Sequence, residues 1–313
     1  MKNLIIILIA VFLISCEKDI FPDLGTSFEA VSVEAMLTDQ GTTQTILVTR
    51  TQPYFQNEFP EKISGAQVFV IDEDSTVFSF VEDEVGYTWT SPDGNPFGQV
   101  GKSYFLVVEV DGARFVSFSQ MGPAPEIDSI GWEFEEKNSF IVEDYYLAQF
   151  YASDFEGPGD AYWIKAYKNG QYLNQPSEIT LAFDAGFGQA GNVDGVAFIQ
   201  PIRQGINPFD VNEDNLLLPP YLIGDSVHVE IYSISPEMFF FLLQVQTQIN
   251  RTGGFGELFA PPIANVPTNI INEDENDSEQ VVGFFNVSAV TSLGQVLTEE
   301  LAEEARQKFD EGL

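Results

Sequence analysis

One stretch, from Gly224 to Ala289, constrains the fold most, because it holds the only long helical pattern in a chain of short strand patterns. A strand is expected over residues 224–234, followed by a helix over about 236–251. Ser235 is a good N-cap, since its hydroxyl can accept a backbone N–H that the helix leaves unpaired. Pro236 suits the first helical position, where its missing N–H costs nothing. Apolar residues recur along the segment at helical spacing: Met238, Phe241, Leu242, Val245 and Ile249.

The first two turns of this helix are expected to be buried on several sides, because Phe239, Phe240 and Leu243 widen its apolar face. Its last turns are more polar and are expected at the surface. Core packing is the favoured interpretation, and a docking helix for a partner protein is the alternative. A last core strand is expected over 281–289, so the second half of the protein is expected to be built round the helix.

The N-terminus has the pattern of an exported lipoprotein. Residues 4–14 form an unbroken apolar run, which is too short to span a bilayer and fits the core of a signal peptide. The run ends in Leu13-Ile14-Ser15-Cys16, which resembles a bacterial lipobox. The resemblance implies that residues 1–15 are removed as a signal peptide, that Cys16 is acylated, and that residues 16–26 form a lipid-anchored tether. A free cysteine inside an ordinary signal peptide is the alternative.

Cys16 is the only cysteine in the chain, so its lipidation would exclude disulfides and leave stability to packing. The residues that follow it, Glu17-Lys18-Asp19, resemble the acidic export tag of Bacteroidetes-type lipoproteins. This resemblance implies an outer-membrane lipoprotein that faces the cell exterior. A plain solvated tether is the alternative.

The charge of the chain argues against several partners. Lys and Arg number 13 against 48 Asp and Glu, which gives a net charge of −35. Such a field repels nucleic acid and anionic surfaces, so no nucleic-acid partner is expected. Many of these carboxylates serve solvation, so charge alone does not predict a cation ligand.

The rest of the pattern predicts a mainly β protein. Seven short strands within residues 27–121 favour an immunoglobulin-like β-sandwich, with Asp111-Gly112 as a two-residue hairpin turn. The Gly-Pro-Ala-Pro segment at 122–125 predicts a stiff linker. A second β-rich domain that carries the long helix is expected over 127–290, and a short amphipathic helix over 297–311.

The sequence assigns no catalytic, cofactor-binding or metal-ligating residue, and no cofactor is expected. Catalysis by Ser-His-Asp or Cys-His groups needs a histidine, and the only one is His228. It alternates with Val227, Val229 and Ile231, so it is expected to face solvent or the second face of a sheet. Hydrolysis by a pair of carboxylates stays an alternative, although nothing selects a pair among the 48 acids.

Two long loops, 184–195 and 209–218, lack any pattern and are the segments expected to carry binding contacts. Gly186 to Gly191 fits G-x-G-x-x-G, but without a strand and a helix around it the match is a chance one. Asp210 to Asp214 has the spacing that begins a calcium loop, but the later glycine and glutamate are missing. An ordinary polar loop is therefore favoured over calcium binding.

Aromatic residues make up 13% of the chain. Tyr145, Trp163 and Tyr167 are candidates for stacking on a sugar or peptide ligand, although core packing is the favoured interpretation.

Several motifs occur in a distinctive order along nearly the whole mature chain. They are Thr49-Arg50-Thr51-Gln52-Pro53-Tyr54, Ile63-Ser64-Gly65-Ala66-Gln67-Val68, Gly101-Lys102-Ser103-Tyr104-Phe105-Leu106, Gly224-Asp225, Asn269-Ile270 and Val282-Gly283-Phe284-Phe285-Asn286-Val287-Ser288. In them the chain resembles a domain-of-unknown-function family of Bacteroidetes lipoproteins, numbered four-two-four-nine. Members of that family are typically encoded beside TonB-dependent outer-membrane receptors.

The resemblance implies a non-catalytic accessory or ligand-binding component of a TonB-dependent uptake system, with the β-barrel receptor as a partner. It supplies no established catalytic residues. A surface hydrolase that uses carboxylates and a structural or adhesive cell-envelope lipoprotein are the alternatives.

The lipid anchor gives a first testable prediction. Mass spectrometry of the mature N-terminus should find Cys16 as the first residue, carrying acyl chains, and Cys16→Ser should release the protein from the membrane fraction. An unmodified Cys16, or a mature chain that starts elsewhere, would contradict the lipobox interpretation.

Overall fold

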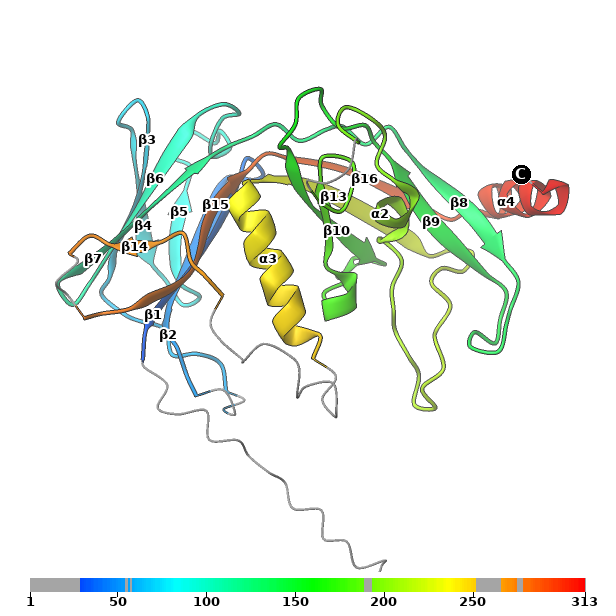
Figure 1. Ribbon diagram of the computed structural model, residues 1–313, viewed down its shortest axis with the longest axis horizontal. Coiled ribbons are helices and arrows are strands. Elements are labelled where there is room, and N and C mark those ends of the chain that lie inside the picture. Colours follow the sequence, from blue (N-terminus) through cyan, green and yellow to red (C-terminus); the bar gives the residue numbers. More distant parts are fainter. Residues whose placement is uncertain are drawn as a thin grey trace, which may run out of the picture.

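The computed structural model describes residues 29–53, 56, 58–188, 193–251, 266–274 and 278–312. The expected signal peptide, the tether and Cys16 lie outside the described residues. The protein is mainly β, as predicted, with two bodies of strands and one long helix between them (Figure 1). Within the described residues, no helix is both long and apolar enough to cross a bilayer.

All seven strands expected in the first part of the chain are present. They are β1 (Val31–Thr38), β2 (Thr43–Arg50), β3 (Gln67–Asp72), β4 (Val77–Glu82), β5 (Tyr87–Thr90), β6 (Ser103–Val110) and β7 (Ala113–Gln120). Their inward side chains alternate with outward ones, as the burial along β1 and β7 shows. Asp111 and Gly112 have φ of +50° and +94°, which confirms the predicted hairpin turn between β6 and β7.

These strands form a single curled sheet, and the predicted immunoglobulin-like sandwich is not confirmed. Two late segments, β14 (Ile271–Asn272) and β15 (Val281–Ser288), complete the sheet in the order β14-β7-β6-β3-β4-β5-β2-β1-β15. The expectation that 281–289 is a core strand of the second domain is wrong in its placement, because β15 pairs in parallel with β1. The local pattern of β15 specifies a buried strand but carries no information about its partner.

Side chains, not a further strand, join the two ends of this sheet. The Asn269 amide donates to the Phe285 carbonyl (2.8 Å) and its oxygen accepts from the Phe285 N–H (3.0 Å). The Ser119 hydroxyl of β7 accepts from the Val287 N–H (3.0 Å), and Ser117 donates to the Asn269 carbonyl (2.8 Å). The outer edge of β15 therefore has partners, and the sheet is nearly closed.

Gly283 permits the closest approach between β15 and β1. Its φ is +99°, and a Cβ atom at this position would lie 2.0 Å from the Val33 carbonyl oxygen. No side chain fits there without separating the two strands, which gives a physical reason for this glycine in the 282–288 motif.

The second body contains the remaining strands. They are β8 (Ser129–Glu135), β9 (Tyr145–Tyr151), β10 (Ala161–Lys168), β11 (Gln171–Tyr172), β12 (Thr180–Phe183), β13 (Ser226–Ile234) and β16 (Val290–Val296). One sheet has the order β11-β10-β13-β16, with β12 also paired to β10, and β8 and β9 form a separate pair. A 3₁₀ turn, η1 (Pro176–Glu178), and a short helix, α2 (Gln200–Gln204), lie between strands.

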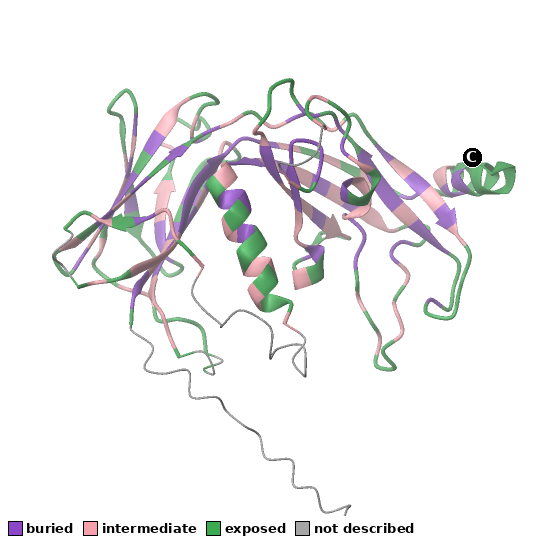
Figure 2. Ribbon diagram, viewed as in Figure 1, coloured by how far each residue is buried: buried purple, intermediate pink, exposed green. Residues whose placement is uncertain are grey.

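Helix α3 (Pro236–Ile249) starts as predicted, since the Ser235 hydroxyl accepts from the Met238 N–H (3.1 Å). Its buried side chains are Met238, Phe239 and Leu242, and each contributes about 1.5–3 kcal/mol on full burial. The prediction that the first two turns are buried on several sides is wrong, because Phe240 and Leu243 are 42% and 40% exposed. Figure 2 shows this helix with a buried stripe and a solvent-facing side. The β-strands contact α3 on one side only, so they cover a narrow stripe of the helix and leave Phe240 and Leu243 exposed.

The predicted C-terminal helix is also present, as α4 (Glu299–Glu311) with Thr298 as its N-cap. Ala302 and Ala305 are buried, and the Phe309 ring packs edge-on against Phe134 of β8. The helix is thereby fixed to the β8–β9 pair.

A short junction connects the two bodies, because β15 continues into β16 through Ala289. The Ser233 N–H donates to the Ala289 carbonyl (3.0 Å), and the Ala289 N–H donates to the Ser233 hydroxyl oxygen (3.0 Å). The same hydroxyl donates to the Gly122 carbonyl in the linker (2.7 Å). Asn286 of β15 accepts from the Ser235 N–H at the start of α3 (3.0 Å). These bonds fix the helix start against the first sheet.

The contact at Gly283 gives a second prediction. Gly283→Ala should lower the free energy of unfolding by about 4 kcal/mol or more, because the new methyl group separates β15 from β1. Gly41→Ala is the matched control, since Gly41 also has positive φ but has nothing within 4 Å of a Cβ atom. It should cost only about 1–2 kcal/mol of backbone strain. Equal losses in urea unfolding would show that the strand contact is unimportant.

Candidate functional site

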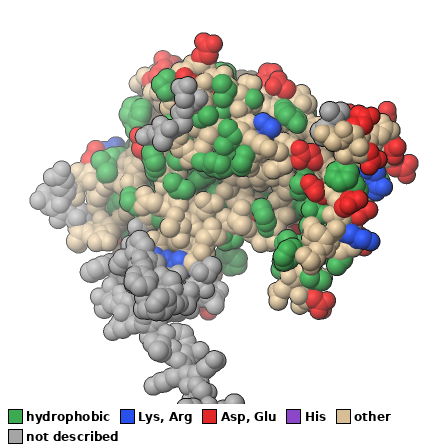
Figure 3. Space-filling model, turned by 45° about the vertical axis from the view of Figure 1, so that its right-hand side comes forward, with side chains coloured by type: hydrophobic (Ala, Val, Ile, Leu, Met, Phe, Trp, Pro, Cys, Tyr) green, Lys and Arg blue, Asp and Glu red, His purple; other side chains and the backbone are tan. Residues whose placement is uncertain are grey.

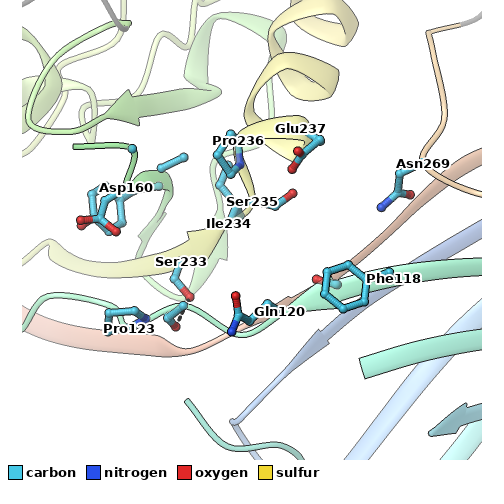
Figure 4. A pocket seen from close by; sticks show the side chains of 15 residues that line it. Phe118, Gln120, Pro123, Asp160, Ser233, Ile234, Ser235, Pro236, Glu237 and Asn269 are labelled. Carbon is cyan, nitrogen blue, oxygen red and sulfur yellow. Dashed lines mark hydrogen bonds between the residues drawn. The ribbon is translucent and has the colours of Figure 1, made fainter. Parts of the chain in front are cut away.

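A cavity of about 330 Å³ opens at the junction of the two bodies (Figure 4). Its walls come from the end of β7, the linker, the residues before β10, the end of β13 and the first turn of α3. The residues that line it include Gln120, Pro123, Asp160, Ser233, Ser235 and Glu237. Concave spaces between packed bodies are where small ligands bind most often.

The local structure of each wall follows from the sequence. Ser233 is the last buried polar residue of β13, and its hydroxyl is held by the linker carbonyl. Pro236 and Glu237 form the first turn of α3, whose backbone N–H groups give that end a partial positive charge. The sequence signal Ser-Pro-Glu predicted this helix start, but nothing predicted that it would border a cavity.

Asp160 is the perturbed acid of this cavity. Burial, together with the nearby carboxylates of Asp154, Asp184 and Asp194, raises the pKa of its carboxyl from 3.8 to about 6. A carboxyl group of this kind changes charge close to neutral pH.

Behind Asp160 lies a group of three further aspartates, which we call the aspartate group: Asp154, Asp184 and Asp194. Each offers a carboxylate oxygen, and these oxygens lie within 4.8 Å of one another. Oxygen ligands of this type suit Ca²⁺ or Mg²⁺. Among the residues that the structure describes, these three acids are close enough to share such an ion.

The aspartate group also organises its own loops. Asp154 accepts from the Tyr162 hydroxyl (2.6 Å), Asp184 accepts from the Gly159 N–H (2.8 Å), and Asp194 accepts from the Gly157 N–H (2.9 Å). Burial raises the pKa of Asp154. No sequence pattern predicts this group, since its members lie 30 and 10 residues apart, on two loops, with no motif spacing.

The loop at 209–218 is stabilised by hydrogen bonds of its own side chains. Asn212 accepts from the Asp214 and Leu216 N–H groups, and Asp210 accepts from the Gln175 amide (2.6 Å). These side chains stabilise the loop and its neighbour, and no residue of the loop lines the cavity. The favoured interpretation as a polar loop agrees with this arrangement.

The loop at 184–195 contributes Asp184 and Asp194 to the aspartate group, and so lies beside the cavity wall. The tip of Gly186–Gly191 lies partly outside the described residues. His228 faces away from the buried Val227, Val229 and Ile231, as predicted, and its side chain is 43% exposed.

Acidic side chains are spread over the molecular face drawn in Figure 3, and basic ones are few.

The three aromatic residues that were candidates for stacking on a ligand differ in their exposure. Tyr145 is buried, whereas Trp163 and Tyr167 are half-buried on the face of the second sheet on which α3 packs.

The model of a family described as a domain of unknown function (DUF4249) matches residues 17–293. No curated protein matches the chain.

Asp160 gives a third prediction. Because its folded pKa is raised, the stability it contributes is present below about pH 4 and is lost as pH rises through about 6. Asp160→Asn should therefore stabilise the protein at pH 7.5, by about 1–2 kcal/mol once partial solvent exposure is allowed for. The gain should shrink towards zero at pH 4. Glu156→Gln, on an exposed part of the same loop, should show no such pH dependence, and a pH-independent effect of Asp160→Asn would contradict the assignment.

Proposed function

Because the chain belongs to the DUF4249 family, a domain family of unknown function, we propose its function from its own residues. It is a lipid-anchored, non-catalytic binding protein on the outer face of the outer membrane, and it holds a small ligand in the junction cavity. It acts as an accessory to a TonB-dependent β-barrel receptor.

The observation that carries this proposal is the cavity itself. It has a volume of about 330 Å³, within the size range of small-ligand sites, and both bodies contribute walls to it. Polar groups converge on it from three segments: Gln120 at the end of β7, Asp160 before β10, and Ser233 with Ser235 where β13 leads into α3. A ligand that contacts both bodies would also bias how they sit against each other.

The charge of the walls restricts the ligand. Asp160 and Glu237 both line the cavity, and the whole chain carries a net charge of −35. A negatively charged ligand would meet like charge at short range and in the overall field. A neutral or cationic ligand is therefore the class that fits.

The anchor and the partner rest on the sequence. The apolar run that ends at Cys16 and the acidic residues after it support attachment to the outer membrane, and the resemblance to lipoproteins encoded beside receptors supports the receptor partner. A surface-anchored protein with a small cavity suits the capture of a ligand before its uptake.

A carboxylate hydrolase is the second candidate function, because one specific observation favours it. Asp160, whose pKa is raised to about 6, lines the same cavity as Glu237, and glycoside hydrolysis uses two carboxyl groups that flank the scissile bond.

A fourth prediction separates the partner from the ligand. The lipidated protein should co-purify a large β-barrel receptor from detergent-solubilised outer membranes, and native mass spectrometry should find a bound small molecule. Gly122→Leu should fill the cavity, since the nearest atom to a Cβ there is 3.8 Å away, and should remove the small molecule but keep the receptor. Gly188→Leu, in open space, is the control.

Two results would contradict the proposal. A preparation that never contains a receptor or a small molecule would exclude the accessory role. Turnover of glycans or peptides that is lost in both Asp160→Asn and Glu237→Gln would establish the hydrolase instead.

A further inference from the structure

The face of the second sheet on which α3 packs carries a group of aromatic and charged side chains that do not line the junction cavity. We call it the tyrosine face: Trp163, Lys165 and Tyr167 on β10, Tyr172 on β11, and His228, Glu230 and Tyr232 on β13. All seven are half-buried, and they alternate with buried residues that point to the core, such as Ile164 and Ile231. Trp163 and Tyr232 also pack against the cluster beneath α3, so this end of the face is held firmly.

The strand register places these side chains in three cross-strand pairs. Trp163 lies opposite Tyr232, Lys165 opposite Glu230, and Tyr167 opposite His228. Pairs of this kind commonly stabilise a solvent-facing sheet, and a Lys–Glu pair would then be expected to form an ion pair.

That ion pair is absent. The Glu230 carboxylate instead accepts from the hydroxyls of Tyr167 (3.0 Å) and Tyr232 (2.7 Å), and His228 Nε2 lies 3.4 Å from its second oxygen. The Lys165 ammonium lies over the rings of Trp163 (4.0 Å to the centroid) and Tyr232 (4.2 Å). The Lys165 ammonium and the Glu230 carboxylate therefore have different partners, and aromatic rings lie beside each of them.

The ammonium of Lys165 is unusual within the described residues. No carboxylate or carbonyl oxygen there accepts a hydrogen bond from it, whereas Lys62, Lys102 and Lys168 each have an ion pair. Burial lowers the pKa of Lys165, although the nearby carboxylates of Glu230 and Glu34 act in the opposite direction. Its three N–H donors are met by ring faces alone, in a chain with 48 acids.

From this arrangement we infer that the tyrosine face is a binding platform for a neutral saccharide. The apolar face of a sugar ring packs on the Tyr167–Tyr172 ring pair, whose centroids are 5.2 Å apart, next to Trp163 and Lys165. Sugar hydroxyls accept from the Lys165 ammonium and donate to the Glu230 carboxylate. This combination satisfies both the free donors of the lysine and the remaining acceptor capacity of the glutamate.

Charge decides between neutral and acidic sugars. Glu230 is on the face itself, and the chain has a net charge of −35, so a uronic-acid unit would be repelled. The platform is separate from the junction cavity, because none of its seven residues lines that cavity. The inference therefore does not depend on the proposed function.

Calorimetric titration of the full lipidated protein, in a detergent without a sugar headgroup, tests the inference. The probes are cello-, malto- and xylotetraose, with tetragalacturonate and a tetrapeptide mixture as the competing classes. At least one neutral tetrasaccharide should bind and should change the tryptophan fluorescence, and Trp163→Phe should remove that change. Lys165→Met and Glu230→Gln should each weaken binding by about tenfold or more through the lost hydrogen bonds.

Three controls make the outcome decisive. Lys137→Met, at an exposed lysine, and Gly122→Leu, in the cavity, should both leave saccharide binding unchanged. Circular dichroism should show that the Lys165 and Glu230 variants keep the fold. The inference is overturned if no neutral tetrasaccharide binds, if both variants bind as the wild type does, or if the tetragalacturonate or the peptides bind instead.

Discussion

The parallel pairing of β15 with β1 is the interaction on which the rest of the structure depends. It joins segments about 250 residues apart in the sequence, with Gly283 against the backbone of Val33. Because β15 runs directly into β16, this pairing also fixes where the second sheet begins. The helix α3 and the walls of the junction cavity are placed by the same few hydrogen bonds around Ser233 and Asn286.

Much of the local structure could be predicted from the sequence, because its causes are local. Alternation of apolar residues specified the first seven strands, Asp111-Gly112 specified a hairpin, and Ser235-Pro236 specified the start of α3. The pairing partner of β15 could not be predicted, since a buried strand pattern does not say which edge it joins. The exposure of Phe240 has the same origin: only the tertiary contact decides how much of an apolar face is covered.

The candidate sites show the same limit. Trp163 and Tyr167 were candidates for ligand contact from their residue types, but Lys165, Glu230 and Tyr232 join them only through the strand register. The aspartate group assembles from two loops, and the cavity assembles from both bodies. Each site therefore needs contacts between segments that are distant in the sequence, and no window of sequence contains it.

The central claim is that late strands complete the first sheet, so that the two bodies form one folding unit. Circular dichroism and urea unfolding of a fragment covering residues 27–125, with and without a peptide covering 266–289, test it most directly. We expect the fragment alone to be unfolded. With the peptide added, it should gain the circular dichroism signal of β-strands and unfold in a cooperative transition. A fragment that unfolds cooperatively by itself, with a stability that the peptide does not change, would contradict it.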